Sequence, residues 1–329
     1  MIERLLVRAP NWLGDVVLSL AAVRDLRRNF PAARIEVLAR PGLAELYRAV
    51  PELDAVRESL GVRHDARAIR GAFDAALLLP NSFGSALPPF LARIRERWGY
   101  ATDGRGPLLT RRARVARDAL RGLSEVYYYR AMLAGVGLRV SAAPELALEC
   151  PQAWRDAARP RLAGAERWVG VAPGAAFGAA KRWIPARYAE TAERVAQQLD
   201  AGVVILGTAA ERALGDAIAG LIAAPVVNLC GQTGLAELAG VLSRLTLLIS
   251  NDSGPMHLAA ALDVPLVAVF GPTDWRETGP FRGRHRLVRE DVECAPCKLR
   301  ACPIDHRCMK RVSAETVARE ALDLVGRPG

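Results

Sequence analysis

One polar stretch of the sequence combines the residue types and the position expected of a ligand site. Asn251-Asp252-Ser253-Gly254 follows an apolar run typical of a buried strand, and a short apolar helix carrying His257 is expected after it. In α/β sheets ligands collect at the carboxyl ends of strands. The free N–H groups and dipole at the start of a helix favour an anion there. The stretch therefore predicts a site for a phosphate-bearing ligand.

A second stretch, after the first expected strand, contains Asn11, Trp12, Gly14 and Asp15. A carboxylate just before a helix often only caps it, and this explanation applies to Asp15. Asn11 and Trp12 are nevertheless unusual in a plain connection, and Gly14 would let a ligand approach the backbone. Asp15 is then a candidate general base.

Residues 173–183 form a loop of small residues that ends in Lys181, Arg182 and Trp183. The loop follows the first expected strand of the second half, at the same sheet edge as Asp252. It can wrap a diphosphate with Lys181 as the point charge; a flexible surface loop with solvated charges is the alternative. Neither the Walker spacing nor a GxGxxG motif occurs in the chain.

Two further turns follow strands of the second half. Glu211 begins a helix, where a carboxylate suits the paired hydroxyls of a ribose or simply favours the amino end of its helix. The turn 231–234 contains Thr233 and either offers backbone contacts to a base or is an ordinary strand–helix turn.

Four cysteines crowd into residues 294–308 with the spacing C-x2-C-x4-C-x5-C, and His306 lies among them. This density permits a tetrahedral metal site, although the spacing differs from the common paired CxxC zinc pattern. Free thiols and a labile disulfide are the alternatives, since a stable disulfide is disfavoured in the cytoplasm. The sequence leaves metal binding by these residues open: Cys294, Cys297, Cys302, Cys308 and His306.

Strand-like and helix-like segments alternate with short connections throughout the chain, which indicates parallel sheets covered on both faces. The stretch 102–117 is rich in Arg and Gly and is expected to be a loop. Two strands stopped by Ala-Pro, at residues 6–10 and 169–173, suggest two similar doubly wound domains facing a cleft. The expected division is residues 1–160, residues 161–310 and a terminal helical segment, 311–329.

The overall composition fits a soluble cytoplasmic protein. The 329 residues are 51% apolar, enough for two cores, yet no apolar run approaches the ~20 residues of a membrane span. The amino terminus lacks a signal-peptide layout. The net charge of +10 reflects either a genomic preference for Arg or attraction to an anionic partner. Nucleic acid is disfavoured, because no basic run is interleaved with aromatic residues.

Taken together, three motifs resemble the ADP-heptose:lipopolysaccharide heptosyltransferases, glycosyltransferase family 9. They are Asn-Trp-Leu-Gly-Asp at 11–15, Pro-Gly-Ala-x-Phe-Gly-x-Ala-Lys-Arg-Trp at 173–183, and Asn-Asp-Ser-Gly-Pro-Met-His at 251–257 with Phe-Gly-Pro-Thr at 270–273. Within the family, Trp12 and the second motif favour type II over type I. The resemblance implies a GT-B fold, with the donor bound by the carboxyl half and the acceptor by the amino half. It also implies that the terminal helix packs back on the amino-terminal domain.

The implied reaction is the inverting transfer of heptose from ADP-heptose to the first heptose of the inner core, a step of core oligosaccharide biosynthesis. The resemblance makes Asp15 the base and Lys181 the group that neutralises the departing ADP. No metal or cofactor is required, in keeping with the lack of a DxD pair, although a divalent metal could stimulate the reaction. The implied donor-binding residues are Gly14, Ala175, Ala176, Glu211 (ribose), Thr233 (adenine), Asp252 (sugar hydroxyls), Ser253 and Gly254 (diphosphate), and His257 (a helix-start hydrogen-bonding partner).

Asn11, Trp12, Asn81 and Ser82 are the implied acceptor-binding residues. The implied partners are ADP-heptose and the anionic lipopolysaccharide core at the inner face of the inner membrane, where the enzyme would be peripheral. Two other functions stay open: heptosyltransferase I or another sugar-nucleotide transferase of the family, and a non-catalytic nucleotide-binding protein.

Overall fold

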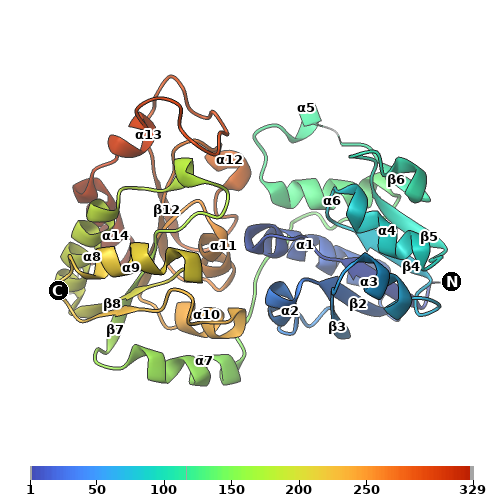
Figure 1. The fold of residues 1–329 in the computed structure, drawn as a ribbon, viewed down its shortest axis with the longest axis horizontal. Coiled ribbons are helices and arrows are strands. Elements are labelled where there is room, and N and C mark those ends of the chain that lie inside the picture. The colour runs from blue at the N-terminus through green and yellow to red at the C-terminus, as the bar shows by residue number, and fades with distance from the viewer. Residues whose placement is uncertain (1, 116, 327–329) are drawn as a thin grey trace. The chain divides into compact units, whose positions relative to one another are not determined.

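The computed structural model describes residues 2–115 and 117–326, and the chain divides into two compact units, residues 1–146 and 147–329 (Figure 1). Within the described residues each unit contains one six-stranded parallel sheet with helices packed against it. The predicted α/β fold with two doubly wound domains is thereby confirmed.

The first sheet has the order β3-β2-β1-β4-β5-β6, which puts the first strand near the centre, as in Rossmann folds. Its apolar runs form strands because both faces are covered; Leu5, Leu6 and Val7 are fully buried. The strands are β1 (Arg4–Arg8), β2 (Arg34–Ala39), β3 (Ala55–Glu58), β4 (Ala75–Leu78), β5 (Glu96–Tyr100) and β6 (Arg111–Ala113). The helices are α1 (Leu13–Asn29), α2 (Pro41–Tyr47), α3 (Val62–Ala68), α4 (Phe83–Leu91), α5 (Arg117–Leu120) and α6 (Glu125–Gly135).

The second sheet repeats this plan with the order β12-β11-β10-β7-β8-β9, so β7 takes the place that β1 has in the first. Its strands are β7 (Arg167–Ala172), β8 (Ala201–Ile205), β9 (Val226–Asn228), β10 (Leu247–Asn251), β11 (Leu266–Val269) and β12 (His285–Val288). The helices are α7 (Gln152–Ala158), α8 (Pro185–Leu199), α9 (Arg212–Ala219), α10 (Leu235–Leu242), α11 (Gly254–Ala261), α12 (Trp275–Thr278), α13 (Arg307–Lys310) and α14 (Ala314–Val325).

Strand β6 lies in the stretch 102–117 that was expected to be a loop. It pairs in parallel with β5, where Trp98 faces Arg111 and Tyr100 faces Ala113. The expectation was wrong because β6 is short and buries only Ala113, so it has no apolar alternation. The Arg111 guanidinium lies over the Trp98 ring, 5.0 Å from its centroid. Residue 116 of this stretch lies outside the described residues.

The boundary between the units falls after Leu146 rather than near residue 160. Helix α7 belongs to the second unit because it packs closely on α10. A Cβ atom on Gly240 of α10 would lie 2.1 Å from the carbonyl oxygen of Trp154 in α7, so glycine permits this approach. The short helix, which follows Pro151, gave no indication in the sequence of the half to which it belongs.

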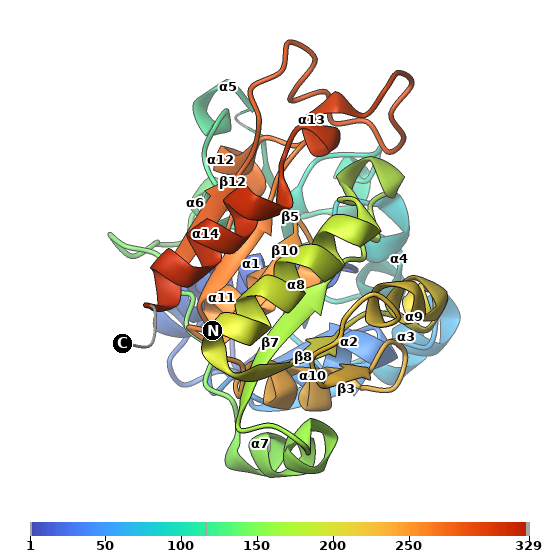
Figure 2. The ribbon, with the colours of Figure 1, turned by 90° about the vertical axis from the view of Figure 1, so that its left-hand side faces the viewer.

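The carboxy-terminal helix, α14, packs within the second unit. Figure 2 shows α14 beside α8, and the buried side chains Val317, Ala318 and Ala321 belong to the core of the second unit. The Trp183 indole donates a hydrogen bond to the carbonyl oxygen of Val312, 3.2 Å away, just before the helix. The apolar face of α14 is thus buried within its own unit. Residues 327–329 of the expected terminal segment lie outside the described residues.

Candidate active site

The loop after β10 is joined to residues 173–183 through the buried side chain of Asn251. Its Oδ1 accepts hydrogen bonds from the backbone N–H of Trp183 (3.1 Å) and from the Tyr188 hydroxyl (2.7 Å). Its Nδ2 donates to the carbonyl oxygen of Pro173, 2.7 Å away. The two loops predicted to share one sheet edge therefore lie in contact. The sequence placed Asn251 in the predicted 251–254 site but gave it no individual role.

Lys181 and Asp252 form a buried ion pair, with 2.7 Å between Nζ and Oδ2. The side chains of Thr273 and Thr278 donate to the same carboxylate oxygen, over 2.6 and 2.8 Å. Asp252 was predicted to meet sugar hydroxyls, but three protein donors share its Oδ2. Its observed contacts hold the lysine in place. The two threonines gave no functional signal beyond their position in and after the Phe-Gly-Pro-Thr motif.

The ammonium group of Lys181 is only partly used by this pair. An ammonium has three donors, and its one hydrogen bond within the described residues goes to Asp252. The Phe177 ring lies 4.9 Å from Nζ and adds a cation–π contact. Two donors remain for an anionic ligand, so the geometry suits the predicted role of Lys181.

Helix α11 begins at this point with backbone donors that no side chain caps. Ser253 is the N-cap residue, but its hydroxyl lies 3.0 Å from the Ser250 hydroxyl instead of capping the helix. The first-turn N–H groups and the helix dipole favour an anion. Ser253 and Gly254 thus lie where the sequence predicts the diphosphate.

His257, in the first turn of α11, is 5% exposed, and its Nδ1 has no hydrogen-bond partner within the described residues. Burial lowers the pKa of His257 to about 4; Asp252 opposes this effect and Lys181 adds to it. The imidazole is therefore neutral at pH 7. A buried ring nitrogen without a partner is unusual.

The contacts of Glu211 bear on both interpretations of its role, the helix start and the ligand contact. Its Oε2 accepts hydrogen bonds from the N–H and the hydroxyl of Thr208, over 2.8 and 2.9 Å, and so forms a capping box. The carboxylate also lies against Gly174, where a Cβ atom would be 2.0 Å from Oε1. Glu211 thus caps its helix and borders the 173–183 loop, in which Ala175 is buried and Ala176 exposed.

The turn containing Thr233 lies against the turn before Glu211. Gly231 has a φ of +72°, and a Cβ atom there would lie 2.5 Å from the Cα of Ala209. Its N–H donates to the carbonyl oxygen of Gly207, 2.8 Å away. The predicted ribose and adenine residues are therefore carried by adjoining turns, and Thr233 is half-buried.

In the first unit, Asp15 lies within the first turn of α1, which begins at Leu13 after the N-cap residue Trp12. Asp15 is thus not the N-cap residue that the plain explanation required. Gly14 and Asp15 are half-buried, whereas Trp12 is 55% exposed. The predicted acceptor residue Asn81 donates from Nδ2 to the Tyr128 hydroxyl, 2.7 Å away.

A cavity of about 340 Å³ opens at the carboxyl ends of the first unit's strands. Two predicted acceptor residues, Asn11 and Ser82, line it, while Trp12 and Asn81 are not among its lining residues. Arg8 and Arg40 also line it, and neither was predicted from the sequence. Arg8 is last in its strand and closely follows the apolar run, so its sequence gave no sign of a site.

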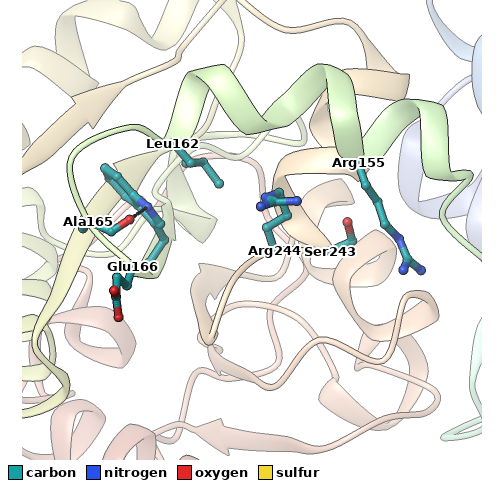
Figure 3. A pocket seen from close by; sticks show the side chains of 7 residues that line it. Arg155, Leu162, Ala165, Glu166, Ser243 and Arg244 are labelled. Carbon is teal, nitrogen blue, oxygen red and sulfur yellow. Dashed lines mark hydrogen bonds between the residues drawn. The ribbon is translucent and has the colours of Figure 1, made fainter.

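A second cavity, of about 320 Å³, lies near the amino end of β7, opposite the edge that carries the predicted residues (Figure 3). Arg155 and Arg244 border it, and the indole of Trp168 donates to the carbonyl oxygen of Ala165 over 3.1 Å. No predicted site residue lines this cavity. Since ligands of α/β sheets bind at the carboxyl edge, we give it no part in the active site.

The cysteine-rich segment, residues 294–308, carries free thiols. Burial raises the pKa of Cys308. Among the described residues, no group of three or more His, Cys, Asp or Glu side chains is arranged to hold a metal ion. No helix in the described part of the chain is long and apolar enough to cross a membrane.

Comparison with known proteins finds heptosyltransferases that match over most of the chain. Residues 62–307 match the family described as glycosyltransferase family 9 (heptosyltransferase). Lipopolysaccharide heptosyltransferase 2 of Salmonella typhimurium is 32% identical over 315 residues, which cover 87% of this chain and 88% of that protein. Lipopolysaccharide heptosyltransferase 1 of Pseudomonas aeruginosa is 28% identical over 325 residues, covering 91% and 87%. The structure of E. coli ADP-heptose lipopolysaccharide heptosyltransferase II matches with a TM-score of 0.84 and 28% identity, covering 98% of each chain.

Proposed function

Because the chain belongs to glycosyltransferase family 9, the heptosyltransferases, we propose that it transfers L-glycero-D-manno-heptose from ADP-heptose to the first heptose of the lipopolysaccharide inner core. The chain is a glycosyltransferase, and its similarity to heptosyltransferase 2 proteins supports this acceptor. The observation that carries the proposal is the Lys181–Asp252 pair at the uncapped start of α11.

The second unit takes the donor in this proposal. The diphosphate of ADP-heptose binds the N–H groups at Ser253 and Gly254, and Lys181 directs its two remaining donors to the phosphate oxygens. Negative charge grows on the bridging oxygen as ADP departs, and a positioned ammonium stabilises that charge. The ribose and adenine lie at the adjoining turns that carry Glu211 and Thr233.

Asp15 supplies the base. The acceptor hydroxyl oxygen attacks C1 of the heptose on the face opposite ADP, and the bond from C1 to the phosphate oxygen breaks with its electron pair on ADP. The hydroxyl proton passes to the Asp15 carboxylate, so the charges balance and the configuration at C1 inverts.

The cavity of the first unit takes the acidic acceptor. Arg8 is 8% exposed and enters no ion pair among the described residues; its hydrogen bonds go to Ala9 O, Leu38 O and Asn11 Oδ1. Burial lowers the pKa of Arg8, with Asp65 acting in the opposite direction. A buried cation that forms no ion pair is costly, and an acidic sugar of the acceptor would offset that cost.

No resident metal or cofactor is needed in this scheme, because Lys181 and the α11 dipole supply the positive charge at the leaving group. A divalent metal added to the assay is then at most stimulatory. The proposed place of action is the cytoplasmic face of the inner membrane, where the lipid-borne acceptor is reached from solution. Nucleic acid has no part in it.

The test is mass spectrometry of the products from ADP-heptose with heptosyl-Kdo2-lipid A, run beside Kdo2-lipid A. We expect one heptose to be added to the first acceptor only. Extension of Kdo2-lipid A instead would indicate a type I enzyme, for which the 28% identity to a heptosyltransferase 1 is the favouring observation. If neither acceptor is extended while ADP still binds, the chain would be a non-catalytic nucleotide-binding protein.

A further inference from the structure

The cysteine-rich segment has contacts that the proposed function leaves unexplained. The N–H of Ala180 donates to the carbonyl oxygen of Arg300, 3.0 Å away. The Nε2–H of His306 donates to the carbonyl oxygen of Ala180 over 2.7 Å. Ala180 directly precedes Lys181. The segment therefore hydrogen bonds to both the N–H and the carbonyl group of the residue before the lysine.

The same segment lies tightly against the rest of residues 173–183, the lysine loop. A Cβ atom on Gly178 would lie 2.3 Å from the carbonyl oxygen of Arg300, so the contact requires glycine. The Arg300 guanidinium lies over the Phe177 ring at 5.3 Å, and Nζ of Lys181 lies over that ring at 4.9 Å. The loop therefore packs against the segment through backbone and side chain.

A second set of contacts reaches the residues that hold Asp252. The N–H of Lys298 donates to the carbonyl oxygen of Pro272 over 2.7 Å, and its Nζ pairs with Glu277 at 2.5 Å. Pro272 precedes Thr273, and Glu277 precedes Thr278; these two threonines donate to Asp252. The segment thus contacts the chain on both sides of the Lys181–Asp252 pair.

We infer that the cysteine-rich segment positions the Lys181–Asp252 pair, and that His306 is the positioning residue for Lys181. The inference rests on the donor-side role proposed above for Lys181. His306 acts through the Ala180 carbonyl and does not touch the substrate. His306 lies at the start of α13 with a left-handed backbone, φ of 58°, and its side chain reaches the loop at Ala180. Misplacing a catalytic cation by about 1 Å costs on the order of 100-fold in rate.

The test compares His306→Ala with His306→Gln, whose side-chain amide can still donate to the Ala180 carbonyl. We expect His306→Ala to lower kcat about 10- to 100-fold, with a smaller change in the Kd for ADP measured by calorimetry. His306→Gln should recover most of kcat. His285→Ala is the matched control, because His285 hydrogen bonds only to Gly283 within its own turn among the described residues; its kinetics should equal those of the wild type.

A double-mutant cycle separates positioning from a general loss of structure. If His306 acts through Lys181, then His306→Ala should change kcat less than about twofold in a Lys181→Ala background. Wild-type kcat in His306→Ala, equal losses in the Ala and Gln variants, or additive losses in the cycle would overturn the inference. Thermal unfolding of each variant identifies losses due to misfolding.

The proposed function can fail separately from this inference. Full activity in Lys181→Ala would remove the role of Lys181 itself, and with it the premise of the positioning. A large loss in Lys181→Ala beside wild-type activity in His306→Ala would overturn only the positioning.

Discussion

Each sheet has a buried cation at its carboxyl edge, and the two cations differ in whether they form an ion pair among the described residues. In the second unit, Lys181 is paired with Asp252, which two threonines also hold. In the first unit, Arg8 is buried to a similar degree, but among the described residues it forms no ion pair and its hydrogen bonds go to carbonyl and amide oxygens, with Asp65 near enough to act on its charge. The two units share one strand order, so the difference arises from side chains and not from the fold.

The two arrangements suit a buried cation to two different functions. A cation paired within the protein has a fixed position before any ligand arrives, which suits a group that must meet a developing charge. A buried cation that forms no ion pair makes the free protein less stable and gains most from an anionic ligand. We therefore expect the lysine to govern the rate and the arginine to govern acceptor affinity.

The largest expected effect comes from Lys181→Met. It removes the charge at the leaving group and leaves Asp252 buried without its cation, so kcat should fall by about 10³-fold. The free energy of unfolding should also fall, by about 3–5 kcal/mol. Steady-state kinetics and urea unfolding measure the two losses, and Lys181→Arg is the control that keeps the charge. Unchanged stability in Lys181→Met would show that the pair is not needed for the fold of the second unit.

Asp15→Asn should have the next largest effect and should be confined to the chemical step. Loss of the base lowers kcat by about 10²- to 10⁴-fold. The Kd for ADP, measured by calorimetry, should stay within about twofold, since the residues proposed to hold the diphosphate, Lys181, Ser253 and Gly254, belong to the other unit. Full transfer activity in a correctly folded Asp15→Asn protein would remove the base from the mechanism.

Arg8→Met tests the other half of the comparison. The KM for the acceptor should rise about 10- to 100-fold because a charge-assisted contact is lost, while the KM for ADP-heptose stays constant. Stability should be unchanged or higher, because a buried charge that forms no ion pair is replaced by an apolar side chain. The control is Arg95→Met, since Arg95 is exposed. A stability loss as large as that of Lys181→Met would remove the contrast between the two cations.

The last expected effect concerns the pH dependence of stability and His257, and it leaves activity at neutral pH unchanged. The pKa of this buried imidazole is lowered to about 4 from 6.5, so between these values the unfolded chain binds a proton that the folded chain does not. The free energy of unfolding should therefore fall as the pH drops from about 6.5 to 4, by roughly 3 kcal/mol in total. His257→Gln cannot titrate, so its unfolding should depend less on pH in this range. Parallel curves for the two proteins would show that His257 does not carry this dependence.

Much of the fold could be predicted because its strands are short apolar runs with clear ends. The Ala-Pro stops after residues 9 and 172 predicted two similar units, and the sheets confirm them. The prediction failed where a segment's partner decides its structure. Strand β6 owes its pairing to β5, and α7 packs on a surface that its own sequence does not identify.

The site could be predicted in part for the same reason. Lys181 and Asp252 were expected at one sheet edge, and the structure brings them into contact. Their supports come from distant parts of the chain: Asn251 bonds back to Pro173, and His306 bonds back to Ala180. Such contacts depend on tertiary packing, so no local spacing could have revealed them.

The hydrogen bonds of the Asn251 side chain limit how the donor-binding loops can open. Its amide group is hydrogen bonded to both ends of the loop 173–183, at Pro173 and Trp183, and to Tyr188 in α8. The loop cannot detach without breaking bonds that also secure a central strand. Amide hydrogen exchange at Trp183 should then follow the unfolding of the sheet and not a local fluctuation. Nucleotide binding would then spend little free energy on ordering the loop.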